Sequence, residues 1–193
     1  MGTDFNGLKP KMMVSEGDHV ERGTPLFCDK DSPEIVFVSP CKGHVKAINR
    51  GDRRALLSVI ISVESLTEKS INYIKLHEKV KSEKDFVRKC ILDSGLWTSF
   101  LTRPYSKIPS PDSEPASIFI TAIDTEPLCP RPDLIINEDL SAFNVGVERI
   151  ASLTKGKVFL CKEEGRDLEV KNYESYDFKG PHPAGLALSL IHI

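Results

Sequence analysis

Hydrophobic and polar residues alternate in short runs over the first third of the chain, and turn-forming residues separate these runs. Val36 and Val38 alternate with Phe37 and Ser39, which is the pattern of a strand with two different faces. Runs of this length and spacing predict a small all-β module of the barrel or sandwich class. The predicted strands cover residues 11–14, 25–28, 34–39, 43–49 and 55–63.

Two motifs in this module resemble the lipoyl/biotinyl-type barrel-sandwich hybrid: GDxVxxGxxL at residues 17–26 and SPxxGxV at residues 39–45. In carrier domains of that type, a modified lysine sits at the tip of the hairpin between these pieces. Lys30 is the candidate here, but it lies too far from residues 39–40, and the turn is better centred on residues 31–33. We therefore interpret Lys30 as a solvated loop charge and keep an acylated carrier lysine as an alternative.

The next segment changes from strands to a helix. Residues 65–81 are polar and weakly patterned, and they predict a connector with a short strand. A helix is predicted from Ser82, because serine is a good N-cap and Asp85 follows three residues later. Gly95 is predicted to end it, because glycine tolerates the left-handed conformation. The predicted buried stripe consists of Phe86, Val87, Cys90 and Ile91.

The second half of the chain predicts an α/β arrangement. A buried strand is predicted at residues 118–123, and the proline-rich passage at residues 128–132 excludes helix and central strand. Asn137 is predicted to cap a helix that ends near residue 155, and a strand follows at residues 158–161. Strand, helix and strand with a tight exit form a βαβ unit, which predicts a parallel pair. Two further segments are predicted, a strand at residues 168–178 and a rigid loop at residues 180–186.

Composition excludes several classes of function. The 193 residues are 40% hydrophobic and 28% charged, and the formal net charge is −2. This balance gives no basic field for nucleic acid, and no apolar run approaches the ~18–20 residues that span a bilayer. The five cysteines are scattered and never spaced as CxxC, which argues against a disulfide framework and against zinc or iron–sulfur ligation. Cys90, Cys129 and Cys161 are predicted to pack as small hydrophobes.

Two carboxylates, Asp124 and Glu126, directly follow the predicted strand at residues 118–123. Ligands in α/β folds usually bind beyond the carboxyl ends of strands, and a spacing of two places both side chains on one side of an extended chain. They are candidates for contacting a ribose, a metal or a partner cation. The alternative is turn capping and solvation. No activating partner is evident, so no catalytic residue is assigned.

Two other sets of residues are candidates for ligand contact. Trp97, the single tryptophan, could line a pocket for a flat ring such as a quinone together with Arg103 and Tyr105, and the alternative is ordinary core and interface packing. His182 lies between two prolines, where a fixed histidine could act as acid, base or ligand, and the alternative is a structural or interface role. The other internal histidines are interpreted as isolated surface residues: His19, His44 and His77.

Glycine-rich phosphate loops are absent from the sequence, which contains neither GxGxxG nor GxxxxGK[ST]. The corner after the strand at residues 118–123 reads Asp-Thr-Glu-Pro, and an acidic corner repels a pyrophosphate. The βαβ unit is therefore predicted to be Rossmann-like without the loops that hold a nucleotide.

Over nearly its whole length, the chain resembles the A subunit of the bacterial sodium-translocating NADH:quinone oxidoreductase. Three runs carry this resemblance in the second half: GLWTSFLTRPYSKIPSPDSEPASIFITAIDTEPL (residues 95–128), FNVGVERIASLTKGKVFLCK (143–162) and FKGPHPAGL (178–186). Two runs carry it in the first half: GLKPKMMVSEGDHVERGTPLF (7–27) and SPCKGHVKAINRGDRRALLSVII (39–61).

The resemblance implies a peripheral subunit on the cytoplasmic face of the bacterial inner membrane. Its partners would be the other subunits, especially the membrane-embedded B subunit, in a translocase that passes electrons from NADH to ubiquinone and exports sodium. That complex uses FAD, FMN, riboflavin and iron–sulfur centres. Related flavin subunits of respiratory complex I and of the Rnf complex hold FMN with a glycine-rich loop, whereas residues 95–104 here are mostly bulky or β-branched. We therefore expect this chain to bind no cofactor and no metal.

These inferences predict four segments. They are a barrel-sandwich hybrid module (residues 1–65), a connector and helix (66–94), a partial Rossmann-like α/β domain (95–187) and a non-native tail (188–193), with truncation at both ends relative to the family. The expected role is support of assembly and of ubiquinone access. The alternatives are an FMN/NADH-binding diaphorase-like module of an Rnf or complex I type enzyme, and a lipoyl/biotinyl-type carrier domain.

Overall fold

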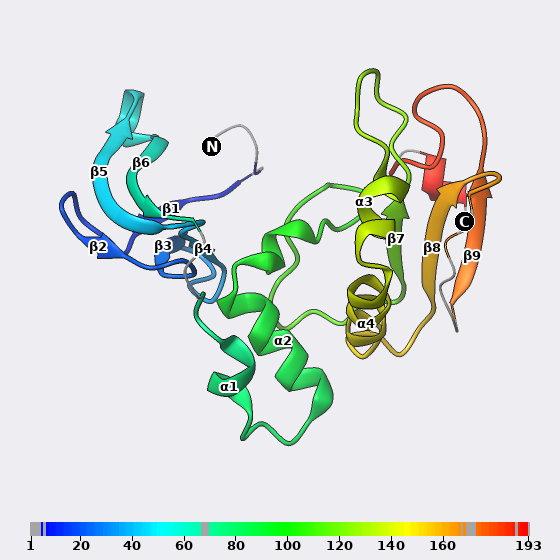
Figure 1. The fold of residues 1–193 in the computed structure, drawn as a ribbon, viewed down its shortest axis with the longest axis horizontal. Coiled ribbons are helices and arrows are strands. Elements are labelled where there is room, and N and C mark those ends of the chain that lie inside the picture. Colours follow the sequence, from blue (N-terminus) through cyan, green and yellow to red (C-terminus); the bar gives the residue numbers. More distant parts are fainter. Residues whose placement is uncertain are drawn as a thin grey trace. The chain divides into compact units, whose positions relative to one another are not determined.

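The computed structural model describes residues 5, 7–66, 70–166, 168, 173–187 and 189–192. The chain divides into two compact units, Met1–Ser113 and Glu114–Ile193, which are described separately below. Figure 1 labels their helices and strands in chain order.

Six strands of the first unit form two three-stranded antiparallel sheets. One sheet has the order β1-β3-β4 and the other has the order β2-β5-β6. The strands are β1 (Pro10–Met12), β2 (His19–Val20), β3 (Pro25–Asp29), β4 (Val36–Val38), β5 (Lys42–Arg50) and β6 (Leu56–Ser65). The predicted strands are confirmed with shifted ends. The short strand β2 was missing from the prediction, and its pairing places His19 opposite His44, so the interpretation of these histidines as isolated was wrong.

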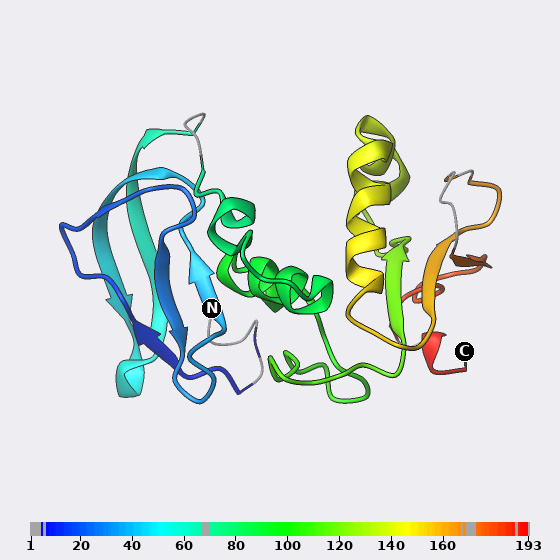
Figure 2. The same ribbon diagram turned by 90° about the horizontal axis from the view of Figure 1, so that it is seen from below.

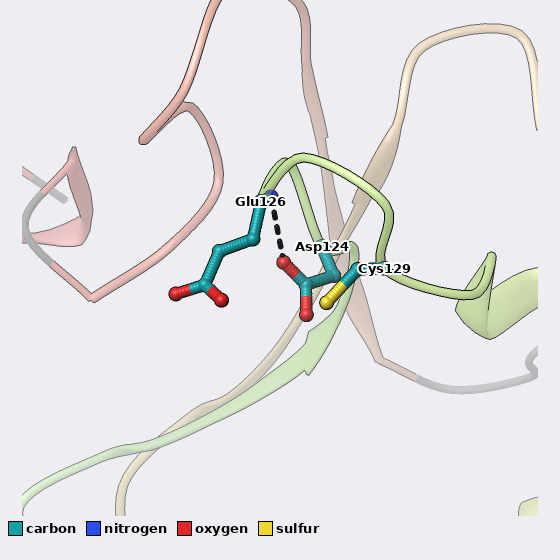
Figure 3. A group of neighbouring side chains, drawn as sticks. All are labelled: Asp124, Glu126 and Cys129. Carbon is teal, nitrogen blue, oxygen red and sulfur yellow. Dashed lines mark hydrogen bonds between the residues drawn. The ribbon is translucent and has the colours of Figure 1, made fainter.

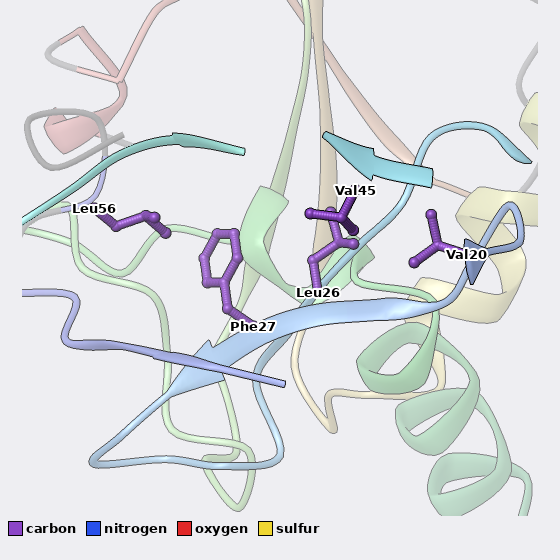
Figure 4. Packing of buried hydrophobic residues seen from close by; sticks show 5 residues of the cluster. All are labelled: Val20, Leu26, Phe27, Val45 and Leu56. Atoms are coloured by element: carbon purple, nitrogen blue, oxygen red, sulfur yellow. The ribbon is translucent and has the colours of Figure 1, made fainter. Parts of the chain in front are cut away.

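The core of this unit lies between the two sheets (Figure 4). Val20, Val45 and Leu56 reach it from between exposed neighbours, because successive side chains point to opposite faces of a sheet. In β3 the consecutive residues Leu26 and Phe27 both contribute, next to a shift in the pairing register with β4. The Phe27 ring stacks on the Phe37 ring with 4.5 Å between the centroids. The buried side chains of this cluster are Val20, Leu26, Phe27, Val45 and Leu56.

The connector after β6 contains a short helix, α1 (Tyr73–His77), so the strand predicted there was wrong. Asn72 caps this helix by accepting a hydrogen bond from the Lys75 amide at 3.1 Å. The Tyr73 hydroxyl donates to the Gly23 carbonyl oxygen at 2.7 Å and so ties the helix to the β module. The sequence did not predict this helix because its hydrophobic pattern is weak. The contact between Tyr73 and Gly23 joins residues that are far apart in the chain, so no local pattern could show it.

The predicted helix is confirmed as α2 (Glu83–Asp93), and the Ser82 side chain accepts from the Asp85 amide. Gly95 follows it with φ 76°, in the left-handed region, and the single turn η2 (Leu96–Ser99) comes next. Within the helix, Val87 and Leu92 are the buried residues. The predicted stripe omitted Leu92, and its other members Phe86, Cys90 and Ile91 are only half-buried.

The second unit contains a parallel sheet in the order β7-β8-β9, which confirms the predicted βαβ unit. Helices α3 and α4 cover one face of this sheet (Figure 2), where Ile136 and Phe143 pack on Ala122 and Leu160. The elements are β7 (Ile118–Ala122), α3 (Pro132–Glu138), α4 (Leu140–Ala151), β8 (Val158–Glu163), β9 (Glu174–Phe178) and the short turn η3 (Ser189–His192). Of the strand predicted at residues 168–178, residues 169–172 lie outside the described residues.

The residue predicted to cap the helix before β8 was wrong. Asp139, not Asn137, caps α4, because its side chain accepts a hydrogen bond from the Ala142 amide at 2.9 Å. Asn137 lies inside α3, which the sequence reading missed. Pro132 occupies the first turn of α3, where a missing amide hydrogen costs nothing, so the proline-rich passage begins this helix instead of excluding it.

Candidate functional site

The corner after β7 brings three polar side chains together (Figure 3). The chain leaves the sheet through the buried Ile123, and Asp124 and Glu126 then face solvent. One Asp124 carboxylate oxygen accepts a hydrogen bond from the Glu126 amide at 2.9 Å, which fixes the tight turn. Ligand atoms of Asp124, Glu126 and Cys129 all lie within 4.8 Å of one another.

The prediction that Cys129 packs as a small hydrophobe was wrong. Cys129 is partly exposed and lies beside the two carboxylates. Its hydrogen bond to Asp124 raises the pKa of the Cys129 thiol, and burial and the charge of the same carboxylate act in the same direction. Conversely, hydrogen bonds from the Glu126 amide and from Cys129, and the nearby His182, lower the pKa of Asp124. The corner therefore holds a carboxylate paired with a protonated thiol.

His182 reaches this corner from the loop after β9. Its Nδ1 lies 3.4 Å from the Thr125 hydroxyl oxygen, and the Thr125 hydroxyl donates to the Ala184 carbonyl oxygen at 3.2 Å. Three predicted site residues, Asp124, Glu126 and His182, thus meet in one place. Thr125 and Cys129 were not predicted as site residues. Their only sequence signal was their position in the same loop after the strand.

The remaining predicted site residues belong to the first unit. The Trp97 side chain is buried, with 4% of its surface exposed, and its Nε1 donates to the Pro109 carbonyl oxygen at 2.9 Å. The guanidinium of Arg103 donates to the Ser106 hydroxyl at 3.0 Å, whereas Tyr105 is 75% exposed. A pocket lined by these three residues stays a prediction.

An apolar cavity that the sequence did not predict lies in the first unit. Its volume is about 580 Å³, and it opens between the two sheets and the end of α2. Leu96, the neighbour of Trp97, forms part of its wall. Other wall residues are Leu26, Phe27, Phe37, Val59 and Ile61. Such a cavity is suited to an apolar ring or chain.

The segment after α2, which the resemblance sets against a glycine-rich flavin loop, packs against the β module. Gly95 approaches β4 so closely that an added β-carbon would lie 3.2 Å from a Val38 methyl group. The left-handed conformation of Gly95 therefore allows the chain to pack closely against β4. At the β7 corner, the Glu126 amide already binds a carboxylate and is not directed at an external anion. Across the described part of the chain, no helix is long and apolar enough to cross a membrane.

The arrangement of a two-sheet β module followed by a parallel α/β unit defines a barrel-sandwich hybrid joined to a Rossmann-like domain. Family models match both parts, as the NqrA N-terminal barrel-sandwich hybrid domain over residues 1–64 and the NqrA second alpha/beta domain over residues 82–193. The chain belongs to the NqrA family.

Similar proteins are named as the A subunit of Na(+)-translocating NADH-quinone reductase. The relative from Vibrio atlanticus is 42% identical over 195 residues, and the relative from Saccharophagus degradans is 44% identical over 195 residues. The relative from Serratia proteamaculans is 42% identical over 197 residues. Each match covers 100% of this chain and 44% of the relative. The chain thus spans less than half the length of these relatives.

Proposed function

We propose that this chain supplies the first two domains of a peripheral subunit in a sodium-translocating NADH:quinone reductase. In this proposal the subunit carries no redox cofactor, supports assembly of the complex at the cytoplasmic side of the membrane and contributes to ubiquinone access. The flavins and iron–sulfur centres belong to other subunits, and the membrane-embedded B subunit is the principal partner. Sodium, NADH and quinone enter this proposal because they appear in the names of the relatives.

The observation that carries the cofactor-free role is the β7 corner. A flavin phosphate placed there would meet the exposed carboxylates of Asp124 and Glu126, and the Glu126 amide at this corner is hydrogen-bonded to Asp124. Like charges repel, and an occupied donor cannot also hold a phosphate oxygen. The packing of Gly95 against β4 supports the same proposal for the other candidate loop.

Support of assembly is proposed from the apolar side chains around α3. Leu128, Leu134 and Ile135 are all exposed, although large apolar side chains are normally buried. They follow the β7 corner along the chain, and the proposal takes them as part of a surface that protein partners cover. The apolar cavity beside Leu96 supports the proposal of quinone access, because a benzoquinone ring with its isoprenoid chain requires an apolar enclosure.

One purification tests these proposals together. The full-length subunit with the double change Leu134→Ser and Ile135→Ser should co-purify less with the membrane subunits than the parent does. Val145→Ser is the matched control, because this α4 side chain is exposed to a similar degree, 50% against 57% for Leu134 and 60% for Ile135. The intact complex is then photolabelled with an azido-ubiquinone, and labelled peptides from residues 94–105 are expected. Unchanged co-purification would contradict the assembly role, and label confined to other subunits would contradict quinone access.

The diaphorase-like alternative is separated by the visible absorbance of the purified full-length subunit. We expect no flavin spectrum, with or without added FMN, after gel filtration. One bound flavin per subunit would overturn the cofactor-free role. The carrier alternative is tested by intact mass, because an acylated Lys30 would add the mass of its modification.

A further inference from the structure

Two histidines and a glutamate form a cluster on the outer face of the sheet β2-β5-β6. His19 and His44 are directly paired across β2 and β5, and their rings meet edge to face with 5.0 Å between the centroids. Glu64 lies on the adjacent strand β6. Its two carboxylate oxygens lie 2.7 Å from His44 Nδ1 and 3.5 Å from His19 Nε2.

The backbone of the module holds these three side chains in place. Val20 and Val45, the residues next to the two histidines, are buried in the core, so alternation directs both imidazoles outward. The pairing of β2 with β5 and of β5 with β6 fixes the distances between the three strands. All three side chains are between 43% and 51% exposed, so a small ion in solution can reach them.

We propose that His19, His44 and Glu64 bind one divalent transition-metal ion of the zinc class. Imidazole nitrogens and a carboxylate oxygen are ligands that Zn²⁺ prefers, and water completes the coordination. Neighbouring ligand atoms around a tetrahedral zinc lie about 3.4 Å apart, given bond lengths of about 2.1 Å. The contact between His19 Nε2 and Glu64 already has this length. The three side chains do not yet offer one ligand atom each within 4.8 Å of one another, so at least one exposed ring must turn toward the ion. The 2.7 Å hydrogen bond between His44 and Glu64 must give way to the ion as well.

The competing explanation is an ordinary surface ion pair, in which a protonated histidine neutralises Glu64. The same chain offers an example of that arrangement in His77, whose Nε2 lies 2.6 Å from an Asp93 carboxylate oxygen. No second imidazole accompanies that pair among the described residues. A metal site requires both histidines, whereas an ion pair requires one, and this difference makes His77 a matched control.

Metal titration of the purified 193-residue chain tests the proposal. The chain is stripped with a chelator and titrated calorimetrically with Zn²⁺ near neutral pH, in a Cys129→Ser background that removes the thiol of the β7 corner. We expect one ion per chain. His19→Ala, His44→Ala and Glu64→Gln should each weaken binding by more than roughly 10- to 100-fold, the loss that follows when only a hydrogen-bonding partner of a ligand is removed, and His77→Ala should leave it unchanged. Binding that survives both His19→Ala and His44→Ala would overturn the proposal, as would absence of saturable binding.

A second measurement requires no variant. Long-range proton–nitrogen NMR spectra follow each imidazole during the titration. Zn²⁺ should shift the His19 and His44 nitrogens together and leave those of His77 in place. A shift of a single imidazole, or equal shifts of all three, would also overturn the assignment.

Discussion

The indole nitrogen of Trp97 donates a hydrogen bond to the main-chain oxygen of Pro109 at 2.9 Å. The Phe100 ring packs on the same indole edge to face, with 5.3 Å between the centroids. The single tryptophan thereby anchors the segment around Pro109, which leads out of the first unit. Its polar group is satisfied within the protein, which is the usual arrangement for a buried tryptophan.

Trp97→Phe should lower the free energy of unfolding of the first unit by about 1–3 kcal/mol, because it leaves the Pro109 oxygen without its donor and leaves a small void. Urea unfolding followed by far-ultraviolet circular dichroism measures this change. Tyr105→Phe is the control, because this side chain is 75% exposed, and it should alter stability by less than about 0.5 kcal/mol. Equal stability of Trp97→Phe and the parent would show that the hydrogen bond does not anchor this segment.

Two glycines of the second unit should respond in opposite directions to alanine. A β-carbon at Gly156 would lie 1.7 Å from the Ala116 main-chain oxygen, so the backbone must move. Gly146 lies within α4, and a β-carbon there meets nothing within 4 Å. We expect Gly156→Ala to destabilise the unit by more than about 2 kcal/mol and Gly146→Ala to stabilise it by about 0.5–1 kcal/mol. Thermal melts of both variants measure these effects, and the same sign for both would contradict the packing described.

The strands of the first unit were predictable because one face of each sheet is buried, and this burial imposes an alternation that β5 illustrates, where Val45 is buried between the exposed His44 and Lys46. Helix α1 was not predictable in the same way. Its hydrophobic pattern is weak, and the Tyr73 hydrogen bond to Gly23 is a contact between residues that are 50 positions apart. Tertiary contacts of this kind override local propensity.

The residues of the candidate site also divide into those that a local sequence pattern reveals and those that depend on contacts between distant parts of the chain. Asp124 and Glu126 were found because they follow an apolar run of residues that predicts a strand, which is a local signal. In the structure this strand, β7, is only partly buried. The contact of Thr125 with His182 joins residues 57 positions apart and depends on how the last loop folds back. The pairing of His19 with His44 was missed because β2 has only two residues, too few for a periodic pattern.

Asp133 should make the second unit less stable in acid. It is buried, and hydrogen bonds from the Arg131 guanidinium lower the pKa of its carboxyl, to which the charge of Arg166 also contributes. A lowered pKa stabilises the fold above the unfolded value of about 4, and this stabilisation is lost as the pH falls through the folded pKa. In urea unfolding between pH 6 and pH 2, about two units either side of that value, Asp133→Asn should show a shallower loss of stability than the parent. Glu138→Gln, an exposed change on the same helix, should retain the slope of the parent, and parallel curves for parent and Asp133→Asn would contradict this role.

Asp124 should protect Cys129 from alkylation. The thiolate is the reactive species, and the hydrogen bond to Asp124 is the main cause of the raised pKa of Cys129. Asp124→Asn removes the negative charge, so the thiolate fraction at pH 7.5 should rise and iodoacetamide should modify Cys129 roughly 3- to 10-fold faster. Peptide mass spectrometry measures this rate. Cys161 serves as an internal reference, because its side chain is 0% exposed and burial raises its pKa to about 11, so it should stay unmodified in the folded protein. An unchanged Cys129 rate in Asp124→Asn, with Cys161 still protected, would mean that the carboxylate does not hold the thiol proton at this corner.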